Sequence, residues 1–298
     1  MTDLSIIIPT YKRADILRRC LERLEMQTAS DVLEVIVVND GHDDATAKLC
    51  TEHAWKIPVS FFEIEKSQQG VARNRGVKAA SAPIVLFIGD DIFLEPNACE
   101  KHLAAHRTNN EQQGTRSVAV LGFTTWDPTL ETTSAMHWLE KTGWQFGYSK
   151  LKRYAHDFIP QKQQHLFTYT SHISLPTDLA RAHPFREDMT LYGWEDIEWG
   201  LRLAQSNVRL FYEPEAVALH HHRMTFEQSL RRMETLGQSL SLISQTTPEL
   251  GRLPCGLKLL AYKLAALLPT MGGKHRAAFL RGIKQGTRNE HRTPSNVT

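Results

Sequence analysis

Short apolar runs alternate with helical patterns over the first third of the chain, and this alternation restricts the fold more than any other feature. The runs lie at residues 4–9, 32–38, 59–64 and 81–88. Apolar residues at helical spacing, or polar helical stretches, fill the intervals between them. Strands that alternate with helices in this way form βαβ units with right-handed crossovers. The sequence therefore predicts an α/β fold with a largely parallel sheet.

The fourth apolar run ends in two adjacent carboxylates, Asp90 and Asp91. In open α/β sheets, ligands bind in the crevice at the carboxyl ends of the strands. The segments 9–11 and 39–41 follow the first two runs, so a parallel sheet places all three segments at one edge. Neighbouring carboxylates repel unless positive charge compensates, and a divalent cation bound to a diphosphate is one such charge. By itself, however, Gly-Asp-Asp is also ordinary turn composition.

Beyond residue 91 the periodicity is less regular. It predicts a helix at 96–108, a strand at 117–123, a helix at 191–203 and extended segments at 208–212 and 216–222. Residues 124–164 have no clear period and contain many aromatic side chains. Such a segment is either a binding loop over the site or an irregular region that its aromatic residues anchor to the core.

Two polar segments can add functional groups to this sheet edge. In residues 69–76, Gly70 permits close backbone approach, and the helix that begins there carries Arg73 and Asn74. In residues 192–199, three acidic residues and two tryptophans lie at the start of a helix. Acidic residues in a first helical turn are also favoured by the helix dipole alone, so this cluster does not by itself define a site.

The composition excludes several classes of protein. The chain has 298 residues, of which 41% are hydrophobic and 23% charged, and its net charge is +2. These values are typical of a globular protein and do not favour a nucleic-acid partner. Its four cysteines are widely spaced without a CxxC pair, which argues against a zinc ribbon or a disulfide scaffold and favours a cytoplasmic location. We expect neither a signal peptide nor a membrane-spanning helix.

From Thr225 onward the pattern becomes helical. It predicts a main domain at residues 1–224, a helical extension at 225–286 and a disordered tail at 287–298. The extension contains an apolar stretch at residues 257–268 that Lys258 and Lys263 interrupt, followed by further basic residues. Such a segment can lie peripherally on an anionic membrane. Packing on the main domain or on a second subunit in a homodimer explains the same pattern and is the interpretation that we favour over membrane contact.

The sequence closely resembles the family 2 glycosyltransferases, which are nucleotide-sugar enzymes of GT-A fold. Five motifs match in the correct order, the resemblance covers about residues 4–222, and the last motif is similar to a galactosyltransferase-like Trp-Glu-Asp segment. Any one motif is weak evidence for the family, but five motifs in the same order are strong evidence. They lie at Ser5–Arg13, Val38–Gly41, Gln69–Ala80, Phe87–Pro96 and Gly193–Leu203. The resemblance implies a Rossmann-like sheet flanked by helices, with the nucleotide sugar bound by residues 1–123 and the acceptor by residues 124–224.

The resemblance also implies specific donor contacts. Asp40 would accept a hydrogen bond from the nucleobase, Asp90 would contact the ribose, and Asp91 would bind the Mg²⁺ or Mn²⁺ that bridges the diphosphate. The family often has a third Asp where this chain has Gly89. The implied nucleotide-sugar site consists of Pro9, Thr10, Tyr11, Arg13, Asp40, Gly70, Arg73, Asn74 and Asp90.

On the acceptor side, the family's Glu-Asp pair makes Asp196 the candidate general base and gives Glu195 an orienting role. Strand alternation sends His220 and His222 to one face, where they are candidates for the metal site, although histidine triplets are also common at surfaces. The candidates for contact with the donor or acceptor sugar are Trp126, His172 and Trp194. At the position of His172, relatives often have Asn.

These features together predict a metal-dependent, inverting transfer of a hexose or aminohexose. The donor would be a UDP-sugar-like nucleotide, and the acceptor a hydroxyl group of a glycan or glycolipid. A retaining glycosyltransferase, a nucleotidyltransferase and a non-catalytic carbohydrate-binding module are the alternatives. No glycine-rich basic loop follows the first strand, which argues against a nucleotidyltransferase, and the absence of GxGxxG argues against a dinucleotide oxidoreductase.

Overall fold

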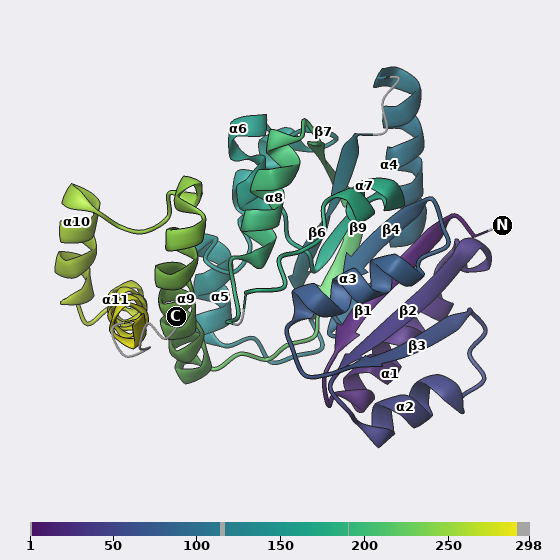
Figure 1. Cartoon of the computed structure of the whole chain (residues 1–298), viewed down its shortest axis with the longest axis horizontal. Helices are drawn as coiled ribbons and strands as arrows, with labels where there is room; N and C mark the ends of the chain where they lie inside the picture. Colours follow the sequence, from purple (N-terminus) through teal and green to yellow (C-terminus); the bar gives the residue numbers. More distant parts are fainter. Residues whose placement is uncertain (1, 114–116, 190, 291–298) are drawn as a thin grey trace, which may run out of the picture.

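A single sheet flanked by helices forms the body of the protein (Figure 1). The structure is a computed structural model that describes residues 2–113, 117–189 and 191–290. Within these residues the sheet has nine strands. They are β1 (Leu4–Thr10), β2 (Leu33–Asp40), β3 (Val59–Ile64), β4 (Ile84–Ile88), β5 (Ile92–Leu94), β6 (Val118–Trp126), β7 (Asp157–Phe158), β8 (His172–Pro176) and β9 (Arg209–His220).

The strand order is β3-β2-β1-β4-β8-β6-β9-β5, and β7 pairs with β9 outside this path. Strands β1 to β4 run parallel to one another, as the sequence predicts. Strand β8 then runs antiparallel to both β4 and β6, and β5 runs antiparallel to β9. The sequence analysis missed β5, β7 and β8, and of these β5 and β7 have only three and two residues, too few to show a period.

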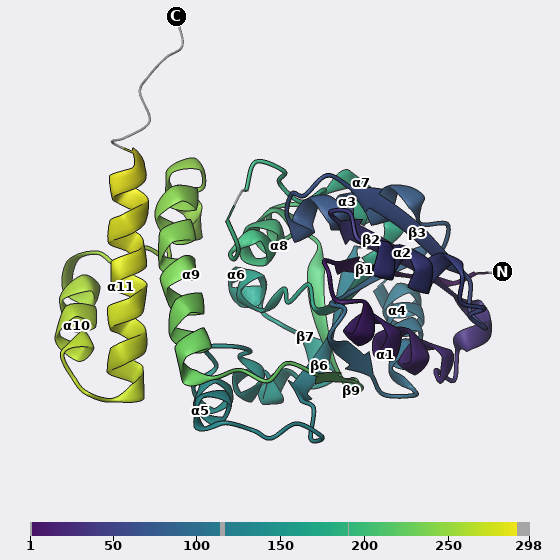
Figure 2. The same ribbon diagram turned by 90° about the horizontal axis from the view of Figure 1, so that it is seen from below.

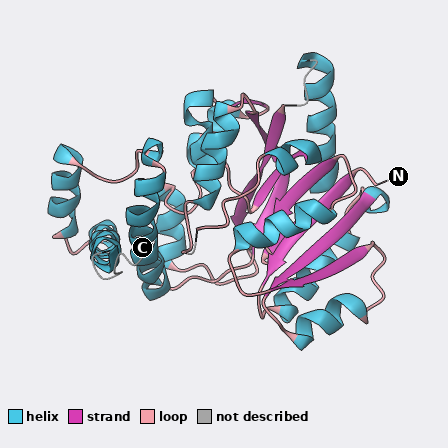
Figure 3. Cartoon of the chain, in the orientation of Figure 1, coloured by secondary structure: helices cyan, strands magenta, loops and turns pink. Residues whose placement is uncertain are grey.

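Helices cover both faces of the sheet (Figures 1 and 3). Successive residues of a strand point to opposite faces, so Ile7 packs with α3 and α8 while Ile6 and Ile8 pack with α1 and α2. Helix α3 lies unusually close to β1, because a Cβ on Gly76 would be 2.4 Å from the Ile7 side chain. The main-domain helices are α1 (Ala14–Glu25), α2 (Asp44–Thr51), α3 (Gln69–Ala79), α4 (Ala98–Gln113), α5 (Ser134–Thr142), α6 (Gln161–Gln164), α7 (Thr177–Ala182) and α8 (Glu195–Gln205).

Two predicted boundaries are wrong for local reasons. Helix α8 begins at Glu195 rather than at residue 191, because Gly193 and Trp194 have φ angles of +101° and +72° that interrupt a right-handed helix. The two extended segments predicted at 208–212 and 216–222 form one strand, β9. A register shift opposite Gly122 bulges this strand without ending it.

The C-terminal extension consists of α9 (Phe226–Thr246), α10 (Gly256–Ala266) and α11 (Met271–Glu290). Helices α9 and α11 lie side by side (Figures 1 and 2). Gly282 permits their close approach, because a Cβ there would lie 1.9 Å from a backbone oxygen of α9. Residues 287–290 continue α11, so the predicted disordered tail begins too early, and its remainder at 291–298 lies outside the described residues.

Across the described residues, none of the helices combines the length and the apolar character needed to cross a membrane.

Candidate active site

A cavity of about 1090 Å³ opens where the parallel strands end. The segments after β1, β2 and β4 contribute its floor, as the strand-end argument predicts. The start of α8 forms a second side, and the C-terminal extension forms a third. The wall residues that matter most for chemistry are Asp40, Asp90, Asp91, Arg73, Glu195 and Asp196.

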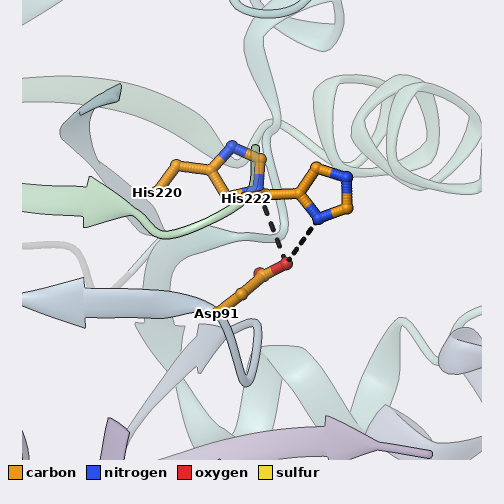
Figure 4. Close-up of side chains that lie close together, drawn as sticks. All are labelled: Asp91, His220 and His222. Carbon is orange, nitrogen blue, oxygen red and sulfur yellow. Dashed lines mark ion pairs between the residues drawn. The ribbon is translucent and has the colours of Figure 1, made fainter. Parts of the chain in front are cut away.

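Asp91, His220 and His222 converge in this cavity (Figure 4). The Asp91 Oδ2 atom lies 3.6 Å from His220 Nε2 and 3.5 Å from His222 Nδ1. The pairing of β5 with β9 creates this cluster, because it places Ile92 directly opposite His220. As alternation predicts, His221 points elsewhere, and its Nδ1 lies 2.6 Å from Asp127.

The three side chains suit a divalent cation. One ligand atom from each residue can be chosen so that all three lie within 4.8 Å of one another. A carboxylate with two imidazoles fits a first-row transition metal better than Mg²⁺, which prefers oxygen ligands. His220 is also held in place, because its ring stacks on Trp126 with 5.2 Å between the ring centroids.

Arg13 joins the two carboxylates after β4. Its guanidinium nitrogens lie 2.8 Å from Asp90 Oδ1 and 3.0 Å from Asp91 Oδ2. Thr10 donates a further hydrogen bond of 2.8 Å to Asp90. Burial, together with the charge of Asp91, raises the pKa of Asp90 to about 7. Burial would also raise the pKa of Asp91, but His220, His222 and Arg13 outweigh it and hold that pKa well below its usual range.

Asp40 lies at the end of β2 and already has partners within the protein. It accepts hydrogen bonds from the backbone N–H of Ser67 at 2.6 Å and the Ser67 hydroxyl at 2.9 Å, and it forms an ion pair with Lys66. The Lys66 ammonium lies 4.6 Å from the centre of the Tyr11 ring. The sequence analysis missed Lys66 and Ser67, although they follow the third parallel strand and the strand-end rule points to them.

Glu195 and Asp196 form a second acidic pair at the start of α8. The backbone N–H of Ile197 donates to Asp196 Oδ1 at 2.8 Å, and Gln69 donates to Glu195. Burial raises the pKa of Asp196 to about 7, and the charge of Glu195 adds to this effect. Asp196 is therefore a carboxylate that exchanges a proton near neutral pH, as a general base requires.

Arg73 lies beside this second pair. It is 3% exposed, and its Nη2 lies 3.3 Å from the Gln69 side-chain oxygen. Burial lowers the pKa of Arg73, while Glu195 and Asp196 act in the opposite direction. Its Nε and Nη1 atoms are buried and have no hydrogen-bond partner among the described residues. Arg73 therefore keeps two buried nitrogens without a hydrogen-bond partner in the described part of the chain, beside the acidic pair.

Helix α9 holds the loop that carries the second pair. The Trp194 indole donates to the Leu236 carbonyl at 2.8 Å, and the Ser239 hydroxyl donates to the Gly193 carbonyl at 3.2 Å. Arg232 and Arg252 also line the cavity, and the described residues form no ion pair with either. The sequence analysis missed both arginines, because nothing in a helical pattern indicates that one face closes a distant cavity.

Gly70 and Asn74 have a structural role, contrary to prediction. Asn74 Nδ2 donates to the Phe185 carbonyl and Asn74 Oδ1 accepts from the Phe185 N–H, both at 2.8 Å. A Cβ on Gly70 would lie 3.1 Å from the same phenylalanine. Neither residue is part of the cavity wall described above. They anchor the segment around Phe185 on α3, because a small residue and an amide allow close backbone contact there.

Two of the three residues predicted to contact the sugars do not line the cavity. His172 is completely buried in β8, where its Nε2 lies 3.1 Å from His102 Nε2, and burial lowers its pKa to about 3. Trp126 is 8% exposed and packs behind His220. The register of β8, which the sequence did not determine, directs His172 toward His102 of α4. Trp126 shares the face of its register partner His220 and stacks on that ring instead of lining the cavity. Trp194 does line the cavity.

Comparison with known proteins identifies the family. The sequence profile of Glycosyl transferase family 2 matches residues 5–170, more than half of the chain. The chain belongs to this family. The validoxylamine A glucosyltransferase of Streptomyces hygroscopicus subsp. jinggangensis (strain 5008) is 29% identical over 244 residues, which cover 76% of this chain and 57% of that protein. The glycosyltransferase GlyA of Streptococcus pneumoniae serotype 4 is 26% identical over 47% of this chain and 22% of its own length. The chain thus spans about half of one relative and less of the other.

Solved structures show the same GT-A fold. A mannosyltransferase from Pyrobaculum calidifontis, solved with GDP-Man and Mn²⁺, has a TM-score of 0.61 at 16% identity and covers 96% of this chain and 87% of its own. S. aureus TarS 1-349, solved with UDP-GlcNAc, has a TM-score of 0.56 at 14% identity, with 97% and 92% coverage. These matches confirm the predicted fold class. Both of these solved structures contain a nucleotide sugar.

Proposed function

We propose that this family member is a metal-dependent, inverting glycosyltransferase. It moves a hexose or aminohexose from a nucleoside-diphosphate sugar, UDP-like in type, to a hydroxyl group of a glycan or glycolipid. The observation that carries the proposal is the meeting of two acidic sites in one cavity. One is the Asp91 cluster with its two histidines, and the other is the Glu195–Asp196 pair.

Asp91, His220 and His222 would hold the cation, and their mixed oxygen and nitrogen donors favour Mn²⁺ over Mg²⁺. When bound, the cation stabilises the negative charge that develops on the departing diphosphate. Arg13 supplements this charge and keeps Asp90 and Asp91 oriented toward the cavity. Tyr11 and Asp40 would shape the nucleobase site, with Lys66 and Ser67 fixing the Asp40 carboxylate.

Asp196 would remove the proton from the acceptor hydroxyl as that oxygen attacks the anomeric carbon. A base works best when its pKa lies near the working pH, and burial brings Asp196 to that range. Gln69 orients Glu195, and Arg73 supplies donors beside the pair. A base on the acceptor side and a diphosphate site in the same cavity suit a single displacement, which inverts the anomeric centre.

The test is a panel of UDP- and GDP-sugars, incubated with the protein in Mn²⁺ or in chelator and analysed by NMR. We expect donor turnover in Mn²⁺ only, with an inverted anomeric configuration in the product. A product of retained configuration would support the retaining alternative. Conversion of the nucleotide sugar into a nucleoside triphosphate and a sugar 1-phosphate when pyrophosphate is added would support a nucleotidyltransferase. Ligand binding without turnover would support a non-catalytic module.

A further inference from the structure

Helix α10 exposes an apolar face that the fold leaves uncovered. None of the residues of α10 is buried, and the exposed fractions of Leu257, Leu260 and Leu264 are 86%, 52% and 59%. Leu267 and Leu268, just after the helix, are 81% and 54% exposed. At about 100° per residue, these positions share one side of the helix. Figures 1 and 2 both place α10 at the outer margin of the molecule, beyond α11. Contiguous exposed apolar surface of this kind marks an interaction site.

The two charged residues beside this face are both positive. Lys258 and Lys263 are exposed, and helical geometry places them on opposite borders of the leucine stripe. Between Glu249 and Glu290 the sequence contains no Asp or Glu and eight basic residues. These are Arg252, Lys258, Lys263, Lys274, Arg276, Arg281, Lys284 and Arg288. Because the whole chain has a net charge of only +2, the rest of it is net negative. Positive charge is therefore concentrated in the part that exposes the leucines.

We propose that α10 lies in the interface of an anionic membrane. The leucine stripe enters the acyl boundary, while Lys258 and Lys263 extend along its borders to the lipid phosphates. Anionic headgroups attract basic residues close to the surface, which adds to the apolar contribution. A second copy of the chain fits this face less well, because a symmetric contact would bring the same lysines together without an acidic partner.

The membrane-facing helix is structurally linked to the active site. Tyr262, on the inner side of α10, is part of the cavity wall, as is Phe279 of α11. Helix α9 packs on α11 and bonds to Gly193 and Trp194, next to the candidate base. This arrangement would hold the cavity close to the lipid surface, where a glycolipid acceptor resides. That last step rests on the proposed function, whereas the membrane contact itself does not.

The experiment is sedimentation of the full chain with vesicles of phosphatidylcholine alone, or of phosphatidylcholine with about one-third phosphatidylglycerol. We expect binding to the anionic vesicles that weakens as salt is raised. Replacement of Leu257 and Leu264 by Ser should weaken this binding by about tenfold or more. Both side chains are exposed, so the fold should be unaffected, and circular dichroism checks this.

A charge-reversal pair provides the matched control. Lys258→Glu with Lys263→Glu should remove the preference for anionic vesicles. Lys48→Glu with Lys78→Glu changes the net charge equally on exposed positions of α2 and α3 and should bind as the wild type does. Equal loss in both pairs would show that only net charge matters and would overturn the proposal.

Two other outcomes would also overturn it. One is the absence of wild-type binding to anionic vesicles. The other is a wild-type dimer, measured by light scattering, that becomes a monomer when Leu257→Ser and Leu264→Ser are introduced. Vesicle binding needs neither donor nor metal. An Asp91→Asn variant that loses activity but still binds vesicles therefore separates failure of the proposed function from failure of this inference.

Discussion

The two acidic pairs in the cavity differ in the charges that surround them. Arg13 contacts both Asp90 and Asp91, and two histidines lie within 3.6 Å of Asp91. Among the described residues, neither Glu195 nor Asp196 forms an ion pair. Their closest partners are the Gln69 amide and a backbone N–H group.

This difference separates two chemical roles for the same side-chain type. Hydrogen bonds from His220 and His222, together with the charge of Arg13, keep Asp91 ionised in spite of burial, which is the state that a metal ligand requires. Asp196 forms no ion pair with the described residues, and burial and the charge of Glu195 are only partly offset by the nearby charges of Arg73 and Arg232. Its pKa is therefore raised to about 7, so it can accept and release a proton. Environment, rather than residue identity, therefore distinguishes the two pairs, in agreement with the donor-side and acceptor-side roles that we propose for them.

The largest expected effect comes from Asp91→Asn. The amide cannot supply the anionic ligand, so Mn²⁺ binding measured by electron paramagnetic resonance should be lost and donor turnover should fall by about 10³-fold or more. Asp178→Asn, on the exposed surface of α7, is the matched control and should behave as the wild type does. Full activity of Asp91→Asn in chelator would refute the metal site.

Asp196→Asn should lower kcat by about 10²- to 10⁴-fold and leave Mn²⁺ binding unchanged. The pH profile gives a sharper test. A base must be deprotonated to act, and its pKa is about 7, so wild-type kcat should rise between about pH 6 and 8 and then level off. The variant should lack this rise. If its residual activity followed the same profile, another group would be the base.

Trp126→Leu should weaken Mn²⁺ binding by about tenfold, because residues behind metal ligands fix the orientation of those ligands. The effect would pass through His220, which stacks on Trp126. Trp126→Phe retains an aromatic surface and should recover most of the affinity. Unchanged Mn²⁺ affinity in a folded Trp126→Leu variant, measured by calorimetry, would show that the stacking does not support the site.

The smallest expected effect is that of Trp194→Phe. It removes the indole hydrogen bond to Leu236 on α9 and keeps the aromatic ring. Loss of one such bond corresponds to about a threefold to tenfold decrease in kcat. Mn²⁺ affinity should not change, because Asp91 is held by other strands. A parallel decrease in Mn²⁺ affinity would mean that the two acidic pairs are coupled.

The sequence was informative where function follows from strand order. Asp40, Asp90 and Asp91 come together because parallel strands end at one edge, and this needs no knowledge of side-chain packing. The same approach failed for His172 and Trp126. The direction of His172 depends on the register of β8, because a shift of one residue reverses the face that a side chain occupies. Trp126 stacks on its register partner His220 and does not line the cavity.

By itself, the sequence determined the α/β class, the glycosyltransferase resemblance and the carboxylates at the strand ends, because apolar periodicity and motif order are local properties of the chain. Only the tertiary structure decided that the C-terminal helices close the cavity with Arg232 and Arg252 and hold the Trp194 loop. It also decided which face of α10 stays uncovered. Contacts between segments far apart in the chain are set by packing and register, and neither is encoded in the period of a single segment.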